Sequence, residues 1–187
     1  MGFYICLECG AGDRKARRSH TTPYGHHCSG KLGLFSLGHE FITDVLRLEF
    51  CLAPSGLAAQ TAQEDPIGFA YSLAYALVEA AAELLEVPST DLNTVVAYEA
   101  GRIIPPILLY DDVPGGAGLV ARLEEEPHLR YCLKLALERI DGACGCGELS
   151  SCYGCLRSYR NQFLHERLRR GPVQVYLREL LDRWPED

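Results

Sequence analysis

The chain has 187 residues, 48% of them hydrophobic and 23% charged, a composition typical of a folded globular protein rather than a disordered one. Its formal net charge of −7 excludes a generally basic nucleic-acid-binding protein, so any anion-binding role must come from a local patch. No apolar run reaches the roughly 18 residues that a membrane-spanning helix needs, and the chain does not begin like a secretory signal. We therefore expect a cytoplasmic protein without a membrane partner.

The N-terminal segment, residues 1–38, is rich in Gly, Arg and His and shows little apolar periodicity. We expect something other than a hydrophobic core to organise it, and we treat residues 39–187 as a separate domain. The first element of that domain is a strand predicted over residues 41–51. Asp65 followed by Pro66 then predicts a capped helix start. The helix that follows is apolar on most faces, so it should be buried.

A hairpin is predicted next, because two β-prone runs in residues 92–112 meet at a turn at Ala100–Gly101. Pro105 and Pro106 should force a bulge into the second strand or place it at a sheet edge, since proline cannot donate to the ladder.

Helices account for most of the remaining chain. A glycine-rich loop leads into a helix within residues 113–126, and a second helix covers 127–141. Two more helices follow a cysteine cluster, the last over 172–184. These elements predict an α+β fold: a small mixed or antiparallel sheet packed with about five helices, with zinc-binding elements near both ends.

Nine cysteines are many for a chain of this length, and in a reducing compartment they favour metal ligation over disulfides. Four of them follow the pattern C-x-C-x5-C-x-x-C: Cys144, Cys146, Cys152 and Cys155. Zinc prefers four thiolate or imidazole ligands in a tetrahedron, and the glycines between these cysteines give the backbone the freedom to turn around a metal. A redox pair would need one C-x-x-C alone, so the cluster predicts a zinc site.

A second zinc site is predicted near the start of the chain, where Cys6 and Cys9 form a C-x-x-C and Cys28 follows. Its fourth ligand is one of three histidines: His20, His26 or His27. We favour His20, because the other two would have to share the turn of Cys28. Four protein ligands leave no open position for an activated water, so both sites are expected to be structural rather than catalytic.

Five arginines follow the second cluster closely: Arg157, Arg160, Arg167, Arg169 and Arg170. With the tyrosines among them, they suit phosphate contacts and base stacking, so we predict that they bind nucleic acid. Arg157 and Arg160 would share one face of a helix. The alternatives are a solvated face, or ion pairs with a protein partner. The stretch RKARRSH, residues 14–20, is a second basic spot.

The stretch YDDVPGGAG, residues 110–118, lies between a predicted strand and a predicted helix. It could bind an anion at the helix N-terminus, or it could be a tight turn packed against a neighbour. Asp111 and Asp112 could also take part in a hydrolytic metal site with other residues near strand ends: His39, Glu40 and Asp44. No nucleophile or base motif accompanies them, so we expect a protein that is not an enzyme.

The chain resembles the helicase-associated zinc-binding domain of MrfA-type DNA-repair helicases in three successive stretches: GHEFITDVLRLEF, ILLYDDVPGGAGLV and CGCGELSSCYGCLRSYRNQFLHERLRR. It is also similar to this domain in DrmB-type subunits of DISARM anti-phage systems, and its N-terminal cysteines look more like the DrmB arrangement. The resemblance implies a zinc site at the four C-terminal cysteines, work on DNA beside a helicase motor, and a structural role for YDDVPGGAG. No nucleotide-binding P-loop is present, so the helicase would be a separate polypeptide.

Three hypotheses follow for the function. The first is a zinc-stabilised accessory module that contacts DNA and a helicase subunit in DNA repair or anti-phage defence. The second is a metal-dependent phosphoester hydrolase or nuclease that uses Asp111 and Asp112. The third is a protein-interaction scaffold, which would bind the helicase but show no salt-dependent binding to DNA.

Overall fold

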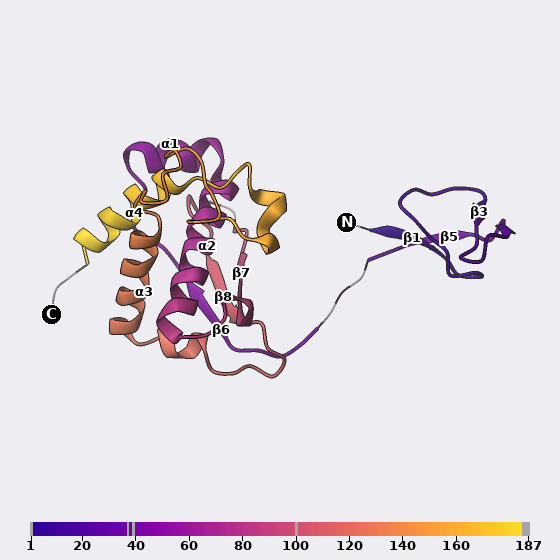
Figure 1. The fold of residues 1–187 in the computed structure, drawn as a ribbon, viewed down its shortest axis with the longest axis horizontal. Helices are drawn as coiled ribbons and strands as arrows, with labels where there is room; N and C mark the ends of the chain where they lie inside the picture. Colours follow the sequence, from indigo (N-terminus) through magenta and orange to yellow (C-terminus); the bar gives the residue numbers. More distant parts are fainter. Residues whose placement is uncertain (1, 37, 39, 100, 185–187) are drawn as a thin grey trace. The chain divides into compact units, whose positions relative to one another are not determined.

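The computed structural model of the chain describes residues 2–36, 38, 40–99 and 101–184 (Figure 1). It divides into two compact units, one that runs to Phe41 and one that begins at Ile42.

The N-terminal unit is built from short antiparallel strands. One sheet has the order β2-β1-β5, and a separate ladder pairs β3 with β4. The strands are β1 Phe3–Cys6, β2 Gly12–Asp13, β3 His20–Thr21, β4 His27–Cys28 and β5 Leu32–Phe35. Among its described residues, the only hydrophobic side chains that are buried are Cys6 and Ala11. So small a core cannot by itself hold the unit together, which is typical of domains stabilised by a metal.

The second unit combines a three-stranded antiparallel sheet with helices, and it confirms the predicted α+β class. Its strands are β6 Val45–Leu48, β7 Leu92–Val96 and β8 Ile107–Asp111. Its α-helices are α1 Gly56–Glu64, α2 Pro66–Leu85, α3 Glu126–Arg139 and α4 Arg170–Asp182. Three short 3-10 helices are also present in the described residues: η1 Ser89–Asp91, η2 Val120–Leu123 and η3 Tyr159–Leu164.

Helix α2 is the centre of this unit and contacts the sheet as well as α1, α3 and α4 (Figure 1). Its start is as predicted: Pro66 occupies the first turn, and the Asp65 side chain accepts a hydrogen bond of 3.0 Å from the Gly68 amide. By length and composition α2 could cross a membrane, but 67% of its apolar window is buried inside the unit. Burial on most of its faces explains why its sequence is largely apolar.

The sheet has the order β6-β8-β7, and the predicted hairpin is confirmed by the antiparallel pairing of β7 with β8. Gly101 in the connection has a φ of +85°, and Ala100 lies outside the described residues. The prediction for the proline pair is wrong, because β8 is the central strand. Pro105 and Pro106 precede its first residue, Ile107, so their missing N–H groups cost the ladder no hydrogen bond.

Three other elements differ from their predictions. The strand predicted over 41–51 is shorter, as β6. The helix predicted within 113–126 is the single 3-10 turn η2, and α3 starts separately at Glu126. The helix after the cysteine cluster is η3, which starts at Tyr159 and is interrupted by non-helical backbone at Asn161. Arg157 therefore precedes the helix and cannot share a helical face with Arg160.

Candidate metal centres

Four possible metal ligands of the N-terminal unit meet although they come from three separate stretches of chain. Cys6 ends β1 and Cys9 follows in the next turn, whereas His20 begins β3 and Cys28 ends β4. The Sγ atoms of Cys6 and Cys28 lie 3.9 Å apart, and the Cys9 Sγ lies 3.1 Å from the His20 Nε2. All four ligand atoms lie within 4.8 Å of one another.

The strand pairing selects His20 from the three histidines. Antiparallel pairing of β3 with β4 places His20 directly opposite Cys28, so both side chains lie on the same face of the ladder. His27 is the neighbour of Cys28 in β4 and therefore points to the other face. His26 and His27 are both exposed.

Two glycines shape this site. Gly10 has a φ of +74° and its amide donates to the Cys6 carbonyl at 2.9 Å, which closes the turn between the first two ligands. Gly30 lies against the sulfurs, because a Cβ added there would stand 2.7 Å from the Cys6 Sγ. Its amide also donates to the Cys28 Sγ at 3.3 Å.

The second cluster lies between α3 and η3 in the larger unit. The Cys144 Sγ lies 3.5 Å from that of Cys146, and the Cys155 Sγ lies 3.8 Å from those of both Cys146 and Cys152. These four sulfurs also lie within 4.8 Å of one another. The Cys152 amide donates to the Cys155 Sγ at 3.2 Å, so the C-x-x-C turn already directs a backbone N–H towards a sulfur.

Both clusters fit zinc. With Zn–S bonds of about 2.3 Å in a tetrahedron, sulfurs should be about 3.8 Å apart, close to the distances of 3.5–3.9 Å in the two clusters. One cluster offers four thiols, and the other offers three thiols and an imidazole. The chain therefore has two zinc sites, and each is closed by four protein ligands.

The thiols of the C-terminal site differ in their proton affinity when no metal is present. The backbone amide of Cys146 lowers the pKa of Cys144 to about 7, against the effect of burial. Burial instead raises the pKa of Cys155 to about 12. Zinc must therefore displace protons from this site at neutral pH, and its binding free energy becomes part of the folding free energy.

Two of the five predicted nucleic-acid-binding arginines donate hydrogen bonds to the zinc loop. The buried Arg170 donates to the Cys146 carbonyl through both Nε, at 3.0 Å, and Nη2, at 2.8 Å. Arg157 donates through Nε to the Ser151 hydroxyl at 3.0 Å. The Arg170 guanidinium is buried against a backbone carbonyl, so it is not available to a phosphate.

Two further arginines form ion pairs with carboxylates distant in sequence. Arg160 pairs with Asp112. Arg167 pairs with Asp65, and its Nε donates to the Asp65 carboxylate at 3.0 Å. These contacts attach the segment after the zinc loop to the sheet and to the start of α2. In this acidic unit, the guanidinium groups already have anionic partners.

The fifth predicted arginine and one that the sequence analysis missed also bind loop carbonyls. Arg169 donates through Nη1 to the Leu149 carbonyl at 2.8 Å. Arg139, at the end of α3, donates through Nε to the Cys155 carbonyl at 3.0 Å and lies 3.2 Å from the Glu79 carboxylate. A short loop around a metal leaves backbone carbonyls that no strand or helix N–H can pair with. An arginine immediately before such a loop could have been recognised in the sequence as a donor for these carbonyls.

The stretch YDDVPGGAG is organised around the carboxylate of Asp111, which is completely buried. Its oxygens accept hydrogen bonds from the amides of Ala117 at 2.8 Å, Leu119 at 2.9 Å and Val120 at 2.9 Å. The predicted anion site at this strand-to-helix junction is therefore filled by the chain's own carboxylate. This geometry is that of a structural turn.

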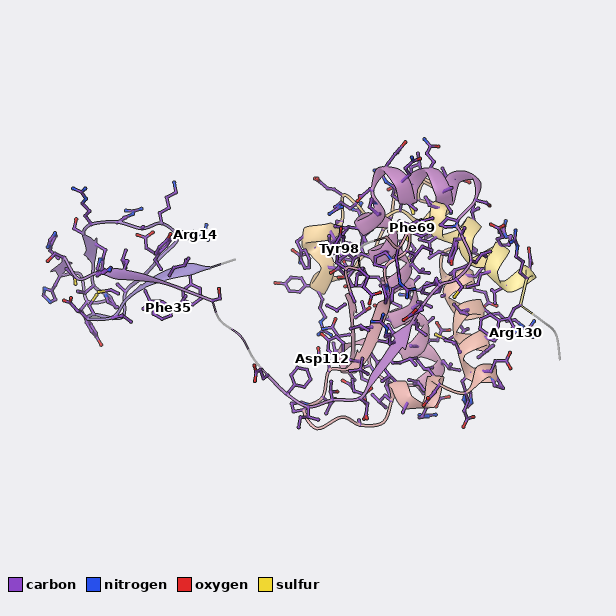
Figure 2. The ribbon with its side chains drawn as sticks, turned by 180° about the vertical axis from the view of Figure 1, so that it is seen from behind. Arg14, Phe35, Phe69, Tyr98, Asp112 and Arg130 are labelled. Atoms are coloured by element: carbon purple, nitrogen blue, oxygen red, sulfur yellow. The ribbon has the colours of Figure 1, made fainter. Side chains whose placement is uncertain are left out.

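The other carboxylates proposed for hydrolysis also make structural contacts. Asp112 is labelled in Figure 2. It pairs with Arg160 and accepts a hydrogen bond of 3.2 Å from the Asn93 side chain. Asp44 accepts one of 3.0 Å from the Gly118 amide. Glu40 is exposed, and His39 lies outside the described residues. Within the described chain, no group of possible metal ligands includes any of these carboxylates.

Comparison with known proteins agrees with the C-terminal zinc site. The model of the family "MrfA Zn-binding domain" matches residues 73–156, which run from α2 through the last cysteine of the cluster. No solved structure matches the chain.

A curated relative covers more of the chain. In an alignment 198 positions long, the chain is 31% identical to Druantia protein DruE of Escherichia coli (strain UMEA 4076-1). The alignment includes 90% of this chain and 10% of DruE, so the chain spans about a tenth of the length of this relative. The chain is thus a protein with two zinc sites that is similar to the MrfA Zn-binding domain over residues 73–156 and to a short part of DruE over most of its length.

Proposed function

We propose that the chain is a zinc-stabilised, non-catalytic accessory module of an anti-phage defence protein, and that it acts in the cytoplasm beside a DNA helicase or translocase. The similarity to DruE and to the MrfA Zn-binding domain supports the connection with defence and with a DNA motor. A DISARM DrmB-type assignment is the narrower form of this proposal, and a role in DNA repair is the other setting in which such a motor would work.

The observation that carries the proposal is the closure of both zinc sites. Each has four protein ligands within 4.8 Å of one another, so neither keeps a position for a metal-activated water. Asp111 has the most buried carboxylate of the predicted hydrolytic set, and this carboxylate accepts hydrogen bonds from three backbone amides. On this proposal the module provides binding surfaces and does not catalyse a reaction.

The experiment is fluorescence anisotropy of the zinc-loaded chain with labelled single-stranded and duplex DNA over a salt series. Binding that weakens steeply as salt rises supports a DNA-contacting module. Adding the chain to its helicase partner should then change the DNA-dependent ATPase rate of the motor. No DNA binding at low salt, together with no effect on the motor, would overturn the proposal.

The hydrolase alternative is tested in the same samples. It requires DNA cleavage that depends on magnesium or manganese and is lost in Asp111→Asn. Asp112→Asn is the cleaner variant, because Asp112 makes fewer structural contacts than the buried Asp111. Intact DNA after incubation with either metal removes this alternative.

A scaffold role is favoured by one specific feature, a group of exposed aromatic side chains beside the C-terminal zinc site. Tyr153 is 65% exposed, Tyr159 84% and Phe163 79%. Tyr153 lies in the zinc loop, whereas Tyr159 and Phe163 belong to η3. Large exposed aromatic side chains are typical anchors of protein interfaces. Co-purification with the motor that is lost on replacing Tyr159 and Phe163 with Ser, while DNA binding is unchanged, would assign this surface to the partner.

A further inference from the structure

The formal charge of the chain is divided unequally between its two units. Residues 1–41 contain five Lys and Arg against three Asp and Glu, a charge of +2. Residues 42–187 contain 13 against 22, a charge of −9, which together with the first unit gives the total of −7. A nucleic-acid backbone is repelled by the larger unit and attracted by the smaller one.

The positive charge of the N-terminal unit is concentrated in one exposed loop between zinc ligands. The loop holds Arg14, Lys15, Arg17 and Arg18, and it connects the turn of Cys9 to the next ligand, His20. Figure 2 labels Arg14 on this unit.

Three of these cations are free to bind an external anion. Arg17 lies 2.9 Å from the Asp13 carboxylate. Arg14, Lys15 and Arg18 are exposed, and within the described part of the chain their side chains have no hydrogen-bond or ion-pair partner. They differ in this from the arginines that follow the C-terminal zinc site.

The loop is also held at both ends, which lowers the entropy lost on binding. At one end, the Asp13 carboxylate accepts a hydrogen bond of 3.1 Å from the Lys15 amide as well as pairing with Arg17. At the other end, His20 is fixed by strand pairing and by its place among the zinc ligands.

A concave polar surface connects the loop with the β3–β4 turn, and that turn carries an exposed aromatic side chain. Arg17, Ser19 and His27 help to line a shallow cavity of about 510 Å³. Tyr24, 87% exposed, projects from the β3–β4 turn next to another lining residue, Gly25. Free cations with an exposed aromatic ring are the combination that binds single-stranded nucleic acid, through phosphate contacts and base stacking.

We propose that this N-terminal zinc unit is the nucleic-acid-contacting surface of the chain, with Arg14, Lys15 and Arg18 on the phosphates and Tyr24 stacked on a base. The proposal rests on the proposed function, and it moves the contact away from the C-terminal arginines. Single-stranded DNA is the preferred form, because a base must be unpaired and accessible to stack on Tyr24.

The test compares two triple variants of the full, zinc-loaded chain by anisotropy with labelled single-stranded DNA. The loop variant is R14A/K15A/R18A. The control R122A/K134A/R178A removes the same charge from three exposed residues of the larger unit. Three lost phosphate contacts should lower the slope of log affinity against log salt by about 2 units, since each contributes roughly 0.7 on a single strand. The control should keep the wild-type slope.

Additional variants separate charge from folding. Both triple variants should retain two zinc ions per chain. R14K/R18K should bind like the wild type, because a lysine also neutralises a phosphate. Tyr24→Ala should weaken binding severalfold without changing the salt slope, while Tyr24→Phe should not. If the loop triple loses zinc, the single variants Arg14→Gln and Arg18→Gln decide the question by their slopes.

The outcomes distinguish this inference from the proposed function. Salt-dependent binding that survives in the loop variant and is lost in the control would overturn the inference while leaving a DNA-contacting module. Equal binding to duplex and single strands, unaffected by Tyr24→Ala, would overturn the stacking contact. No binding of the wild type to DNA, but binding to anionic lipid vesicles that the loop variant loses, would overturn both the inference and the DNA part of the proposed function.

Discussion

Asp111 shows how one carboxylate can hold a glycine-rich turn in place. It is completely buried and its oxygens satisfy three backbone amides, those of Ala117, Leu119 and Val120. Nearby, Gly116 has a φ of +74° and an added Cβ would stand 2.3 Å from the Asp44 carboxylate. The aspartates and the glycines of this stretch are therefore required by one compact turn.

Replacing Asp111 with Ala should lower the free energy of unfolding by about 3 kcal/mol, because three backbone N–H groups, including that of the buried Val120, would lose their acceptor. Chemical denaturation measures this loss. Asp112→Ala is the matched control, and it should cost about 1 kcal/mol or less because its ion pair with Arg160 is partly exposed. Equal stability of the two variants would contradict the structural role of Asp111.

Asp65 links stability to pH. The hydrogen bond from Arg167 lowers the pKa of Asp65 below its ordinary 3.8, against burial, and the Gly68 amide lowers it further. A lowered folded-state pKa means that the unfolded chain takes up the proton first as the solution is acidified. The stabilisation is therefore complete well above pH 3.8 and is lost as the pH falls through the lowered folded-state pKa.

Comparing wild type with Asp65→Asn tests this linkage. Asparagine keeps the helix cap but not the ionic pair, so the wild type should be more stable above about pH 5, and the difference should shrink below about pH 4. Both proteins keep the same zinc sites, so loss of metal in acid affects them alike. A constant difference across this pH range would show that Asp65 has an ordinary pKa.

At the scale of elements, two arginines from neighbouring helices hold the backbone of the C-terminal zinc loop by hydrogen bonds. Arg139 from α3 and Arg170 from α4 bind the carbonyls of Cys155 and Cys146, two of the zinc ligands. Such contacts behind the ligands fix their orientation and so tune the affinity for the metal. The loop and the helices on either side of it thus form one element.

Arg170→Ala should speed zinc release from this site by roughly 10-fold or more, because groups behind metal ligands typically contribute that factor to affinity. Transfer of zinc to a coloured chelator measures the rate. Arg170→Lys should recover only part of the loss, since an ammonium cannot reproduce the two-pronged contact. Arg178→Ala, at an exposed position of α4, is the control. Unchanged zinc release together with weakened DNA binding would show that Arg170 contacts nucleic acid rather than supporting the zinc site.

At the scale of the molecule, each unit contains its own zinc site, but the sites relate differently to the hydrophobic core. The N-terminal site replaces a core, with Cys6 and Ala11 as the buried hydrophobic side chains of the described residues there. The C-terminal site joins a large core, because Cys155 and Leu156 belong to the same buried cluster as α2 and α4. Loss of each zinc should therefore have a different effect on folding.

Cys9→Ser should reduce the zinc content from two ions per chain to one and leave the main thermal transition unchanged. Cys152→Ser should also lose one zinc, but it should lower the main transition, because its site is continuous with the core. Metal analysis and calorimetry of both variants make the comparison. A lowered main transition in Cys9→Ser would show that the two units unfold together.

Local features of the sequence were sufficient for several elements of this protein. The spacing of the cysteines predicts two zinc sites, because ligands close in sequence must share a turn around the metal. The pair Asp65–Pro66 predicts the start of α2, because capping depends on residues within one turn. The alternation of apolar and β-branched residues around one glycine turn predicts the hairpin of β7 and β8.

Only the tertiary structure decided the partners of the charged residues and the order of the sheet. Arginines clustered in the sequence resemble a phosphate-binding patch, but Arg167 lies against Asp65 and Arg160 against Asp112. The proline pair before β8 looks like an edge signal until β6 is seen to pair with that strand. These outcomes depend on contacts between residues many positions apart. The sequence around one residue does not specify which distant residues the folded chain places next to it.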